Sequence, residues 1–226
     1  ANTGARVKHY IHTGALLGEN LTCLSDAHVD IERQLIKRVD VLAQHQLILD
    51  ALGVADHGHV IHHALDYKPF LSLPHEKKSG VVFIGEGVPR KGANDFVAVI
   101  EQGGFEAKVM CGSNDEYFNK LGYKTHFFDE HSQIAKAEFI RSGALGMHLS
   151  HCECFPYAVL EMLLAMPVIV PSEFVWSRPF EELGAVRVPK DQVLSTAEHL
   201  INSPCNPQKV IDYFDSAADC WKRLLQ

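Results

Sequence analysis

The chain has 226 residues, 46% of them hydrophobic and 22% charged, which is typical of a globular protein with a sizeable core. Its net charge of -7 gives no general attraction to nucleic acid, so no nucleic-acid partner is expected. No apolar run approaches the roughly 20 residues of a membrane-spanning helix, and the first residues show no signal-peptide pattern. The six cysteines are therefore expected to be free thiols in a reducing compartment, which predicts a cytoplasmic protein.

The first 70 residues have an irregular pattern that predicts a partial α/β domain. Strands are expected at 7–12, 39–43 and 60–62, and helices at 26–37 and 46–52, the second helix ending at Gly53. Three strands and two helices make half of a doubly wound domain. Residues 71–80, which include Pro74 and a run of three charged residues, are expected to form a linker.

From residue 81 to 226 short apolar runs alternate with helical patterns. The continuous run Val81–Ile84 is typical of a strand buried on both faces. The further strands are expected at 107–111, 124–128, 144–149, 168–170 and 185–188, and the helices at 94–102, 132–141, 156–165, 191–201 and 207–225. This alternation predicts a doubly wound, Rossmann-like parallel sheet with helices on both faces. The last helix is expected to pack back on the N-terminal part.

Ligands of such sheets bind at the carboxyl ends of the strands. The loops expected there are 85–92, 112–114, 128–131, 150–156 and 171–177. The most informative pattern lies in the fourth of them. Glu153 precedes the helix expected at 156–165, and Glu161 lies just over one turn inside it. The free N–H groups at the start of that helix suit a phosphate. The alternative is that both glutamates are merely solvated charges.

Residues 153–161, followed by the proline and strand at 167–170, resemble the E-x7-E region of retaining GT-B glycosyltransferases of the glycosyl transferase group 1 type. Residues 83–92 resemble the glycine loop of that family, which ends in lysine and glycine. Residues 109–112 resemble its next strand and glycine, and residues 66–70 resemble the segment that leads into its second domain. The matches follow the family order across residues 39–202. The resemblance therefore implies a GT-B-like fold with a truncated N-terminal domain.

The resemblance also implies a role for each matching residue. Glu161 matches the carboxylate that holds the ribose hydroxyls, Glu153 the carboxylate near the transferred sugar, and Lys91 the lysine that neutralises the donor diphosphate. His12 matches a histidine that approaches the donor sugar, so Glu153 and His12 are the catalytic candidates. The remaining substrate-binding candidates come from the glycine loop, the next strand end and the start of the helix: Gly85, Arg90, Gly112, Phe155, Pro156, Tyr157 and Ala158.

The function that the resemblance implies is transfer of a hexose from a nucleoside-diphosphate sugar, of the UDP or GDP type, to an unidentified acceptor with retention of configuration. A lysine and a helix N-terminus would stabilise the leaving diphosphate, and a carboxylate would favour the cationic sugar. No cofactor and no metal are therefore expected. A zinc cluster of His148, His151, Cys152 and Cys154 is the alternative, but their spacing is not that of paired zinc ligands.

Three departures from the family pattern leave two other functions open. Glu86 stands where the family usually has arginine, although Arg90 could supply the charge. The stretch between Glu161 and Pro167 is one residue short and lacks its glycine. The glycine-rich segment that normally precedes the His12 strand is absent from this sequence. The alternatives are a nucleotide-sugar-binding subunit that depends on a second polypeptide, and a sugar-nucleotide epimerase of GT-B architecture.

Overall fold

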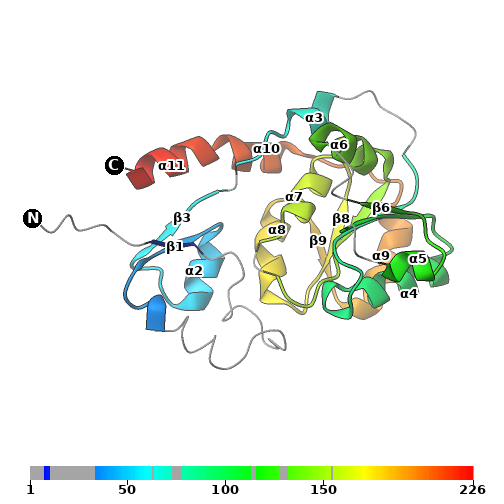
Figure 1. Ribbon diagram of the computed structural model, residues 1–226, viewed down its shortest axis with the longest axis horizontal. Coiled ribbons are helices and arrows are strands. Elements are labelled where there is room, and N and C mark those ends of the chain that lie inside the picture. Colours follow the sequence, from blue (N-terminus) through cyan, green and yellow to red (C-terminus); the bar gives the residue numbers. More distant parts are fainter. Residues whose placement is uncertain are drawn as a thin grey trace, which may run out of the picture.

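The computed structural model describes residues 8–10, 34–62, 64–72, 78–112, 116–127, 132–153 and 155–225. His12 and most of the helix expected at 26–37 lie outside the described residues. The strands form two parallel sheets, visible on either side of Figure 1. The N-terminal sheet has the order β1-β2-β3, and the C-terminal sheet has the order β6-β5-β4-β7-β8-β9.

The N-terminal sheet consists of β1 (Lys8–Tyr10), β2 (Asp40–Ala43) and β3 (Gly58–Val60). Helix α2 (Gln46–Leu52) has the predicted bounds, because both of its ends are capped. The His45 side chain accepts a hydrogen bond from the N–H of Leu47, and Gly53 ends the helix at φ 69°. Strand β3 ends before the predicted run 60–62 does.

The C-terminal sheet has the six predicted strands, of which two have the predicted bounds, three are shorter and one is longer by a residue. Its strands are β4 (Val81–Ile84), β5 (Ala107–Cys111), β6 (Thr125–Phe127), β7 (Leu145–Met147), β8 (Val168–Pro171) and β9 (Val186–Val188). Its helices are α4 (Ala93–Gly103), α5 (Tyr117–Lys120), α6 (Gln133–Ser142), α7 (Tyr157–Leu163), α8 (Arg178–Glu182) and α9 (Val193–Leu200). The short helices α5 and α8 were not predicted, since neither is long enough to show a periodic pattern.

Strand β4 lies at the centre of the C-terminal sheet and is buried on both faces, as its apolar run predicted. Val82 and Ile84 join a core with α6 and α7, whereas Val81 and Phe83 join a second core with α4, α5 and α9. Val81 pairs with Ala107 of β5 and with Leu145 of β7. The sheet is therefore parallel and covered on both faces, which confirms the predicted fold class.

The chain ends in two helices, α10 (Gln208–Asp215) and α11 (Ala217–Leu225), which run from the C-terminal sheet to the N-terminal one (Figure 1). A single helix was predicted over 207–225, but Ser216 ends α10. Its Oγ donates to the carbonyl of Tyr213 at 2.7 Å and contacts Nδ1 of His62. Tyr213 in turn donates its hydroxyl to the carbonyl of Gln44 at 3.4 Å.

Helix α3 (Lys68–Ser72) was not predicted and occupies the start of the expected linker. It packs against α6. Among the described residues no helix is both long and apolar enough to cross a membrane.

Candidate functional site

The loops after β4 and β7 lie against each other at the carboxyl edge of the C-terminal sheet. The carbonyl of Arg90 accepts hydrogen bonds from the N–H of His151 at 2.8 Å and from the hydroxyl of Ser150 at 3.1 Å. Gly92 has φ +75°, and a Cβ on it would lie 2.2 Å from the carbonyl oxygen of Leu149. Only glycine allows this approach. The predicted neighbourhood of loops 85–92 and 150–156 is thus confirmed.

This contact brings Lys91 and Glu153 together, 62 residues apart in the chain. Nζ of Lys91 donates to Oε1 of Glu153 at 2.5 Å, and Nε2 of His148 lies 3.1 Å from the same oxygen. The Glu153 side chain is 9% exposed. Burial favours its neutral form, but the hydrogen bonds and electrostatic interactions with His148 and Lys91 outweigh burial and hold the pKa of Glu153 at about 2. Glu153 is therefore ionised, and it is not the solvated loop residue of the alternative.

Glu161 lies in the middle of α7 and is buried as well. Its Oε1 accepts a hydrogen bond from Nζ of Lys136 on α6 at 2.8 Å. Its Oε2 lies 2.7 Å from the same ammonium. Burial raises the pKa of Glu161, and Lys136 opposes that rise only in part. Glu161 is thus a buried carboxylate whose charge Lys136 stabilises only in part, rather than a helix-surface charge.

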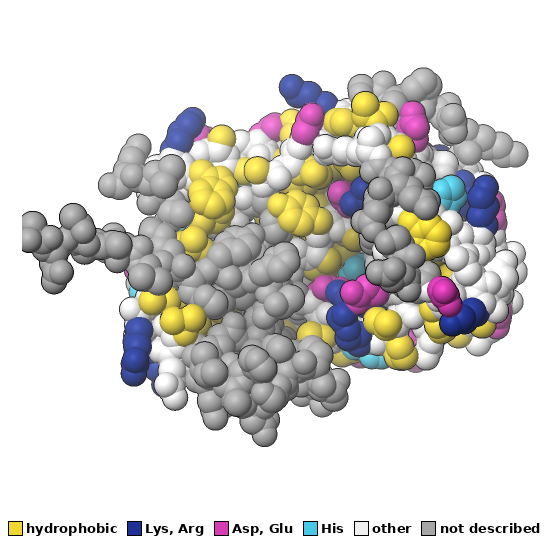
Figure 2. All heavy atoms as spheres, viewed as in Figure 1, with side chains coloured by type: hydrophobic (Ala, Val, Ile, Leu, Met, Phe, Trp, Pro, Cys, Tyr) yellow, Lys and Arg dark blue, Asp and Glu magenta, His cyan; other side chains and the backbone are white. Residues whose placement is uncertain are grey.

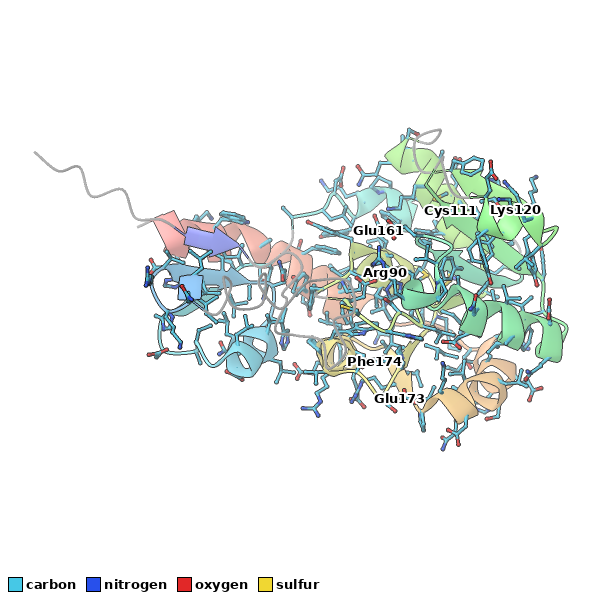
Figure 3. All side chains as sticks on the ribbon, turned by 60° about the horizontal axis from the view of Figure 1, so that its bottom comes forward. Arg90, Cys111, Lys120, Glu161, Glu173 and Phe174 are labelled. Atoms are coloured by element: carbon cyan, nitrogen blue, oxygen red, sulfur yellow. The ribbon has the colours of Figure 1, made fainter. Side chains whose placement is uncertain are left out.

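Glu86 and Arg90 form an ion pair one turn apart in the loop after β4, with Nη2 of Arg90 donating to Glu86. Both side chains are exposed, and the acid therefore does not stand alone beside the site. In Figure 3 Arg90 and Glu161 both lie near the middle of the molecule. Figure 2 shows acidic, basic and histidine side chains gathered near the middle of one face.

Residues 155–158, between the two glutamates, contain a core side chain and the start of α7. The Phe155 ring is buried against Phe180 at 4.5 Å and Tyr213 at 5.7 Å between ring centroids. Pro156 caps α7, and Tyr157 and Ala158 begin it in half-buried positions. The Phe155 side chain therefore belongs to the core, which leaves only the backbone of this residue for a ligand.

The other predicted residues lie at the same edge, apart from His12, which is outside the described part of the chain. The N–H of Gly85 donates to the carbonyl of Met110 at 3.1 Å, which places Gly85 beside the end of β5. Gly112 follows that strand directly. The structure thus places Gly85, Arg90, Lys91, Gly112 and Glu153 in the loops that follow three neighbouring strands, with Glu161 on the helix that begins after Glu153.

Sequence reasoning missed three polar residues at this site. Lys136 holds Glu161 from another helix, so no local pattern could reveal it. His45, in the N-terminal half, lies beside the segment between the two glutamates, with its ring 6.2 Å from that of Phe155 and its Nε2 3.3 Å from Glu182. His148 was considered only as a zinc ligand. Among the described residues no group of three or more potential ligands could hold a metal ion.

No protein-family model and no curated protein matches the sequence. Solved structures do match. One is HepE from Anabaena in complex with UDP and glucose, with 15% identity, a TM-score of 0.70, and coverage of 96% of this chain and 71% of that one. Another is the pneumococcal O-GlcNAc transferase GtfA in complex with UDP and GlcNAc, with 12% identity, a TM-score of 0.73, and coverage of 97% and 52%.

A third is the sucrose-phosphate synthase from Thermosynechococcus elongatus, with 16% identity, a TM-score of 0.69, and coverage of 96% and 65%. The chain spans about half of TarM, of which it covers 47%. At these identities the likeness shows the fold. The two parallel sheets, the crossing C-terminal helices and these neighbours together show that the chain has the GT-B fold of glycosyltransferases.

Proposed function

We propose that this chain binds a nucleoside-diphosphate sugar and transfers its sugar to an acceptor with retention of the anomeric configuration. The observation that carries the proposal is Glu161. A buried carboxylate whose charge a single ammonium stabilises only in part is costly unless a ligand completes it. Two ribose hydroxyls would donate to such a carboxylate. Two of the structural neighbours were solved with UDP, which favours a UDP-type donor.

The remaining residues suit the chemistry of this transfer. Bond cleavage leaves positive charge on the sugar and negative charge on the diphosphate. The ammonium of Lys91 would bind the diphosphate and stabilise the leaving group. Glu153, ionised and beside Lys91, would favour the cationic sugar. With a lysine and backbone N–H groups in this role, transfer needs no metal.

The acceptor is expected to enter from the side of the N-terminal sheet, where His45 faces Phe155 and Glu182. The proposed role of His12 belongs to the same side. The acceptor and a second polypeptide that completes this side stay predictions from the sequence. The assay for transfer therefore includes cell extract as a source of both.

A thermal-shift screen of nucleoside diphosphates and their sugars tests the first half of the proposal. A ligand at 100 times its Kd stabilises the native state by about 2.7 kcal/mol, which raises the midpoint. UDP or GDP and its sugars should raise it, and free sugars should not. No shift with any nucleotide would overturn the proposal.

The second half is tested with the donor identified by that screen. NMR of the product or of the hydrolysed sugar should show the starting anomeric configuration, and activity should persist in a chelator. Lys91→Ala should weaken donor binding and turnover together, because the diphosphate is present in both states. Glu153→Gln should lower turnover of bound donor more than affinity, by about 10²-fold or more. Normal turnover of bound donor in Glu153→Gln would remove its catalytic role.

A further inference from the structure

The ammonium of Lys91 has two competing partners. In this structure it forms an ion pair with Glu153 at 2.5 Å. In the proposed function the same ammonium meets the donor diphosphate, whose two phosphates carry more charge than one carboxylate. The Lys91 side chain is 21% exposed and flexible enough to turn. Glu153 would then be left in a site that is closed to water on most sides.

His148 is placed to hold Glu153 when Lys91 turns away. It lies directly after β7, with its N–H bonded to the carbonyl of Ile169 at 3.0 Å. Its ring meets the face of Trp176 edge-on, with centroids 5.5 Å apart, and Trp176 is itself fixed by a hydrogen bond to the carbonyl of Ser150 at 3.1 Å. The His148 side chain is 5% exposed. Unlike Lys91 it is too enclosed to leave.

When Lys91 turns away from Glu153, His148 can remain in contact with the carboxylate. Among the described residues, Glu153 contacts Lys91 and His148, both through Oε1. Arg90 is paired with Glu86, and His151 is paired with Asp95 at 2.9 Å. Because Glu153 must be an acceptor, Nε2 of His148 must carry the hydrogen, in the neutral ring or in the imidazolium.

We propose that His148 is a positioning residue, which keeps Glu153 ionised and fixed in orientation while Lys91 binds the donor diphosphate. Because Lys91 and His148 both contact Oε1, Oε2 is the oxygen that would meet the sugar. This inference rests on the proposed function for the identity of the ligand that draws Lys91 away. The His148–Glu153 contact and the burial of both residues carry the rest.

Titration of Glu153 tests the inference without any donor. Substitution of Lys91 by Met imitates the state in which the ammonium has left, and carboxyl NMR then follows Glu153, assigned with Glu153→Gln. In Lys91→Met the carboxyl should still ionise at a pH below its ordinary range, because His148 holds it. In the double variant Lys91→Met/His148→Leu it should ionise above that range, because burial acts alone. Equal titration in the two variants would overturn the proposal.

Activity supplies the second measurement. His148→Leu should keep donor affinity within about twofold and lower turnover of bound donor at least about tenfold. His148→Gln retains an N–H donor and should recover part of the loss. The matched control is His151→Leu, which removes another histidine–carboxylate pair from the same loop and should change neither quantity. Circular dichroism checks that each variant is folded.

The two measurements separate the inference from the proposed function. If no donor binds, the proposed function fails, and the titration still decides the role of His148. If donor binds and turns over but His148→Leu has normal turnover, the positioning role is wrong and the proposed function stands.

Discussion

At the residue scale, Glu153 and Glu161 are both buried carboxylates, yet their surroundings move their pKa values in opposite directions. His148 and Lys91 outweigh the effect of burial on Glu153, whereas burial prevails over Lys136 at Glu161. A pair of carboxylates whose environments diverge in this way is common where two acids have different tasks. The protein stabilises the charge of the Glu161 carboxylate only in part, as expected of a group to which a bound ligand donates further hydrogen bonds.

Glu161→Gln tests this reading of Glu161. The raised pKa means that the ionised carboxylate costs folding free energy at neutral pH, so a neutral amide should leave the free energy of unfolding unchanged or higher. The amide accepts the ribose hydroxyls less well, and nucleotide affinity should fall by about 1.5–3 kcal/mol, roughly 10- to 100-fold. Calorimetry and urea unfolding measure the two quantities. Unchanged affinity in the folded variant would refute the ribose contact.

Glu153 gives a stability that depends on pH in a predictable direction. A pKa of about 2, against an ordinary value of 4.5, is worth about 3 kcal/mol. This contribution is present in full above pH 4.5 and is lost as the pH falls towards 2, because the unfolded chain takes up the proton first. Urea unfolding of the wild type and of Glu153→Gln between pH 2 and 7 should therefore converge at the acid end. Parallel curves across that range would show that Glu153 is not held ionised.

At the element scale, the loop after β4 is fixed against the end of β7 by a single close approach. Gly92 combines φ +75° with a Cβ position 2.2 Å from the Leu149 carbonyl oxygen. The adjacent residue Lys91 meets Glu153 through this contact. The geometry of the site thus depends on one residue without a side chain.

Gly92→Ala should push the loop after β4 away from the end of β7. The left-handed backbone costs an alanine about 1–2 kcal/mol, and the overlap with Leu149 requires a further shift of the loop. The matched control is Gly104→Ala at the end of α4, which has φ +63° but nothing within 4 Å of its Cβ. Gly92→Ala should lose more unfolding free energy than the control, and it should also lose donor affinity. An equal loss in both variants would show that the close approach is unimportant.

At the scale of the whole molecule, one hydrophobic core joins the two sheets. It contains Val41 and Leu49 from the N-terminal sheet and α2, Phe155 and Val168 from the C-terminal sheet and its site, and Tyr213 from α10. Tyr213 stacks on His62 at 4.2 Å and on Phe155 at 5.7 Å, so it contacts both halves. A shared core of this kind predicts one cooperative unfolding transition.

Tyr213→Ala should weaken that coupling. Truncating a buried aromatic side chain costs about 3–5 kcal/mol, and here the loss falls at the junction of the two sheets. Urea unfolding of the wild type followed by circular dichroism and by tryptophan fluorescence should give one midpoint, and the variant should give two. The control Trp221→Ala, on the neighbouring helix and 40% exposed, should change little. Two midpoints in the wild type would show that the halves unfold independently.

The parallel C-terminal sheet could be predicted from the sequence, because apolar runs and helix caps are local signals. The strand Val81–Ile84 has the expected bounds, and the helices expected at 94–102 and 132–141 are each within one residue of their expected ends. It also indicated which loops carry the site, since parallel strands place their carboxyl ends at one edge. The short helices α3, α5 and α8 and the break at Ser216 were missed, because tertiary contacts rather than periodicity form them.

The electrostatics of the site could not be predicted, because it depends on contacts between residues far apart in the chain. Lys136 reaches Glu161 across 25 residues and Lys91 reaches Glu153 across 62, and no spacing in the sequence encodes either pair. His148 was visible in the sequence but had no partner there, because its contact depends on how the loop after β7 folds back. Burial has the same origin: a glutamate in a loop looks solvated until the surrounding elements are packed around it. The ionisation of Glu153 and the incomplete stabilisation of the charge on Glu161 therefore result from packing. Desolvation and charge pairing act through space and not along the chain.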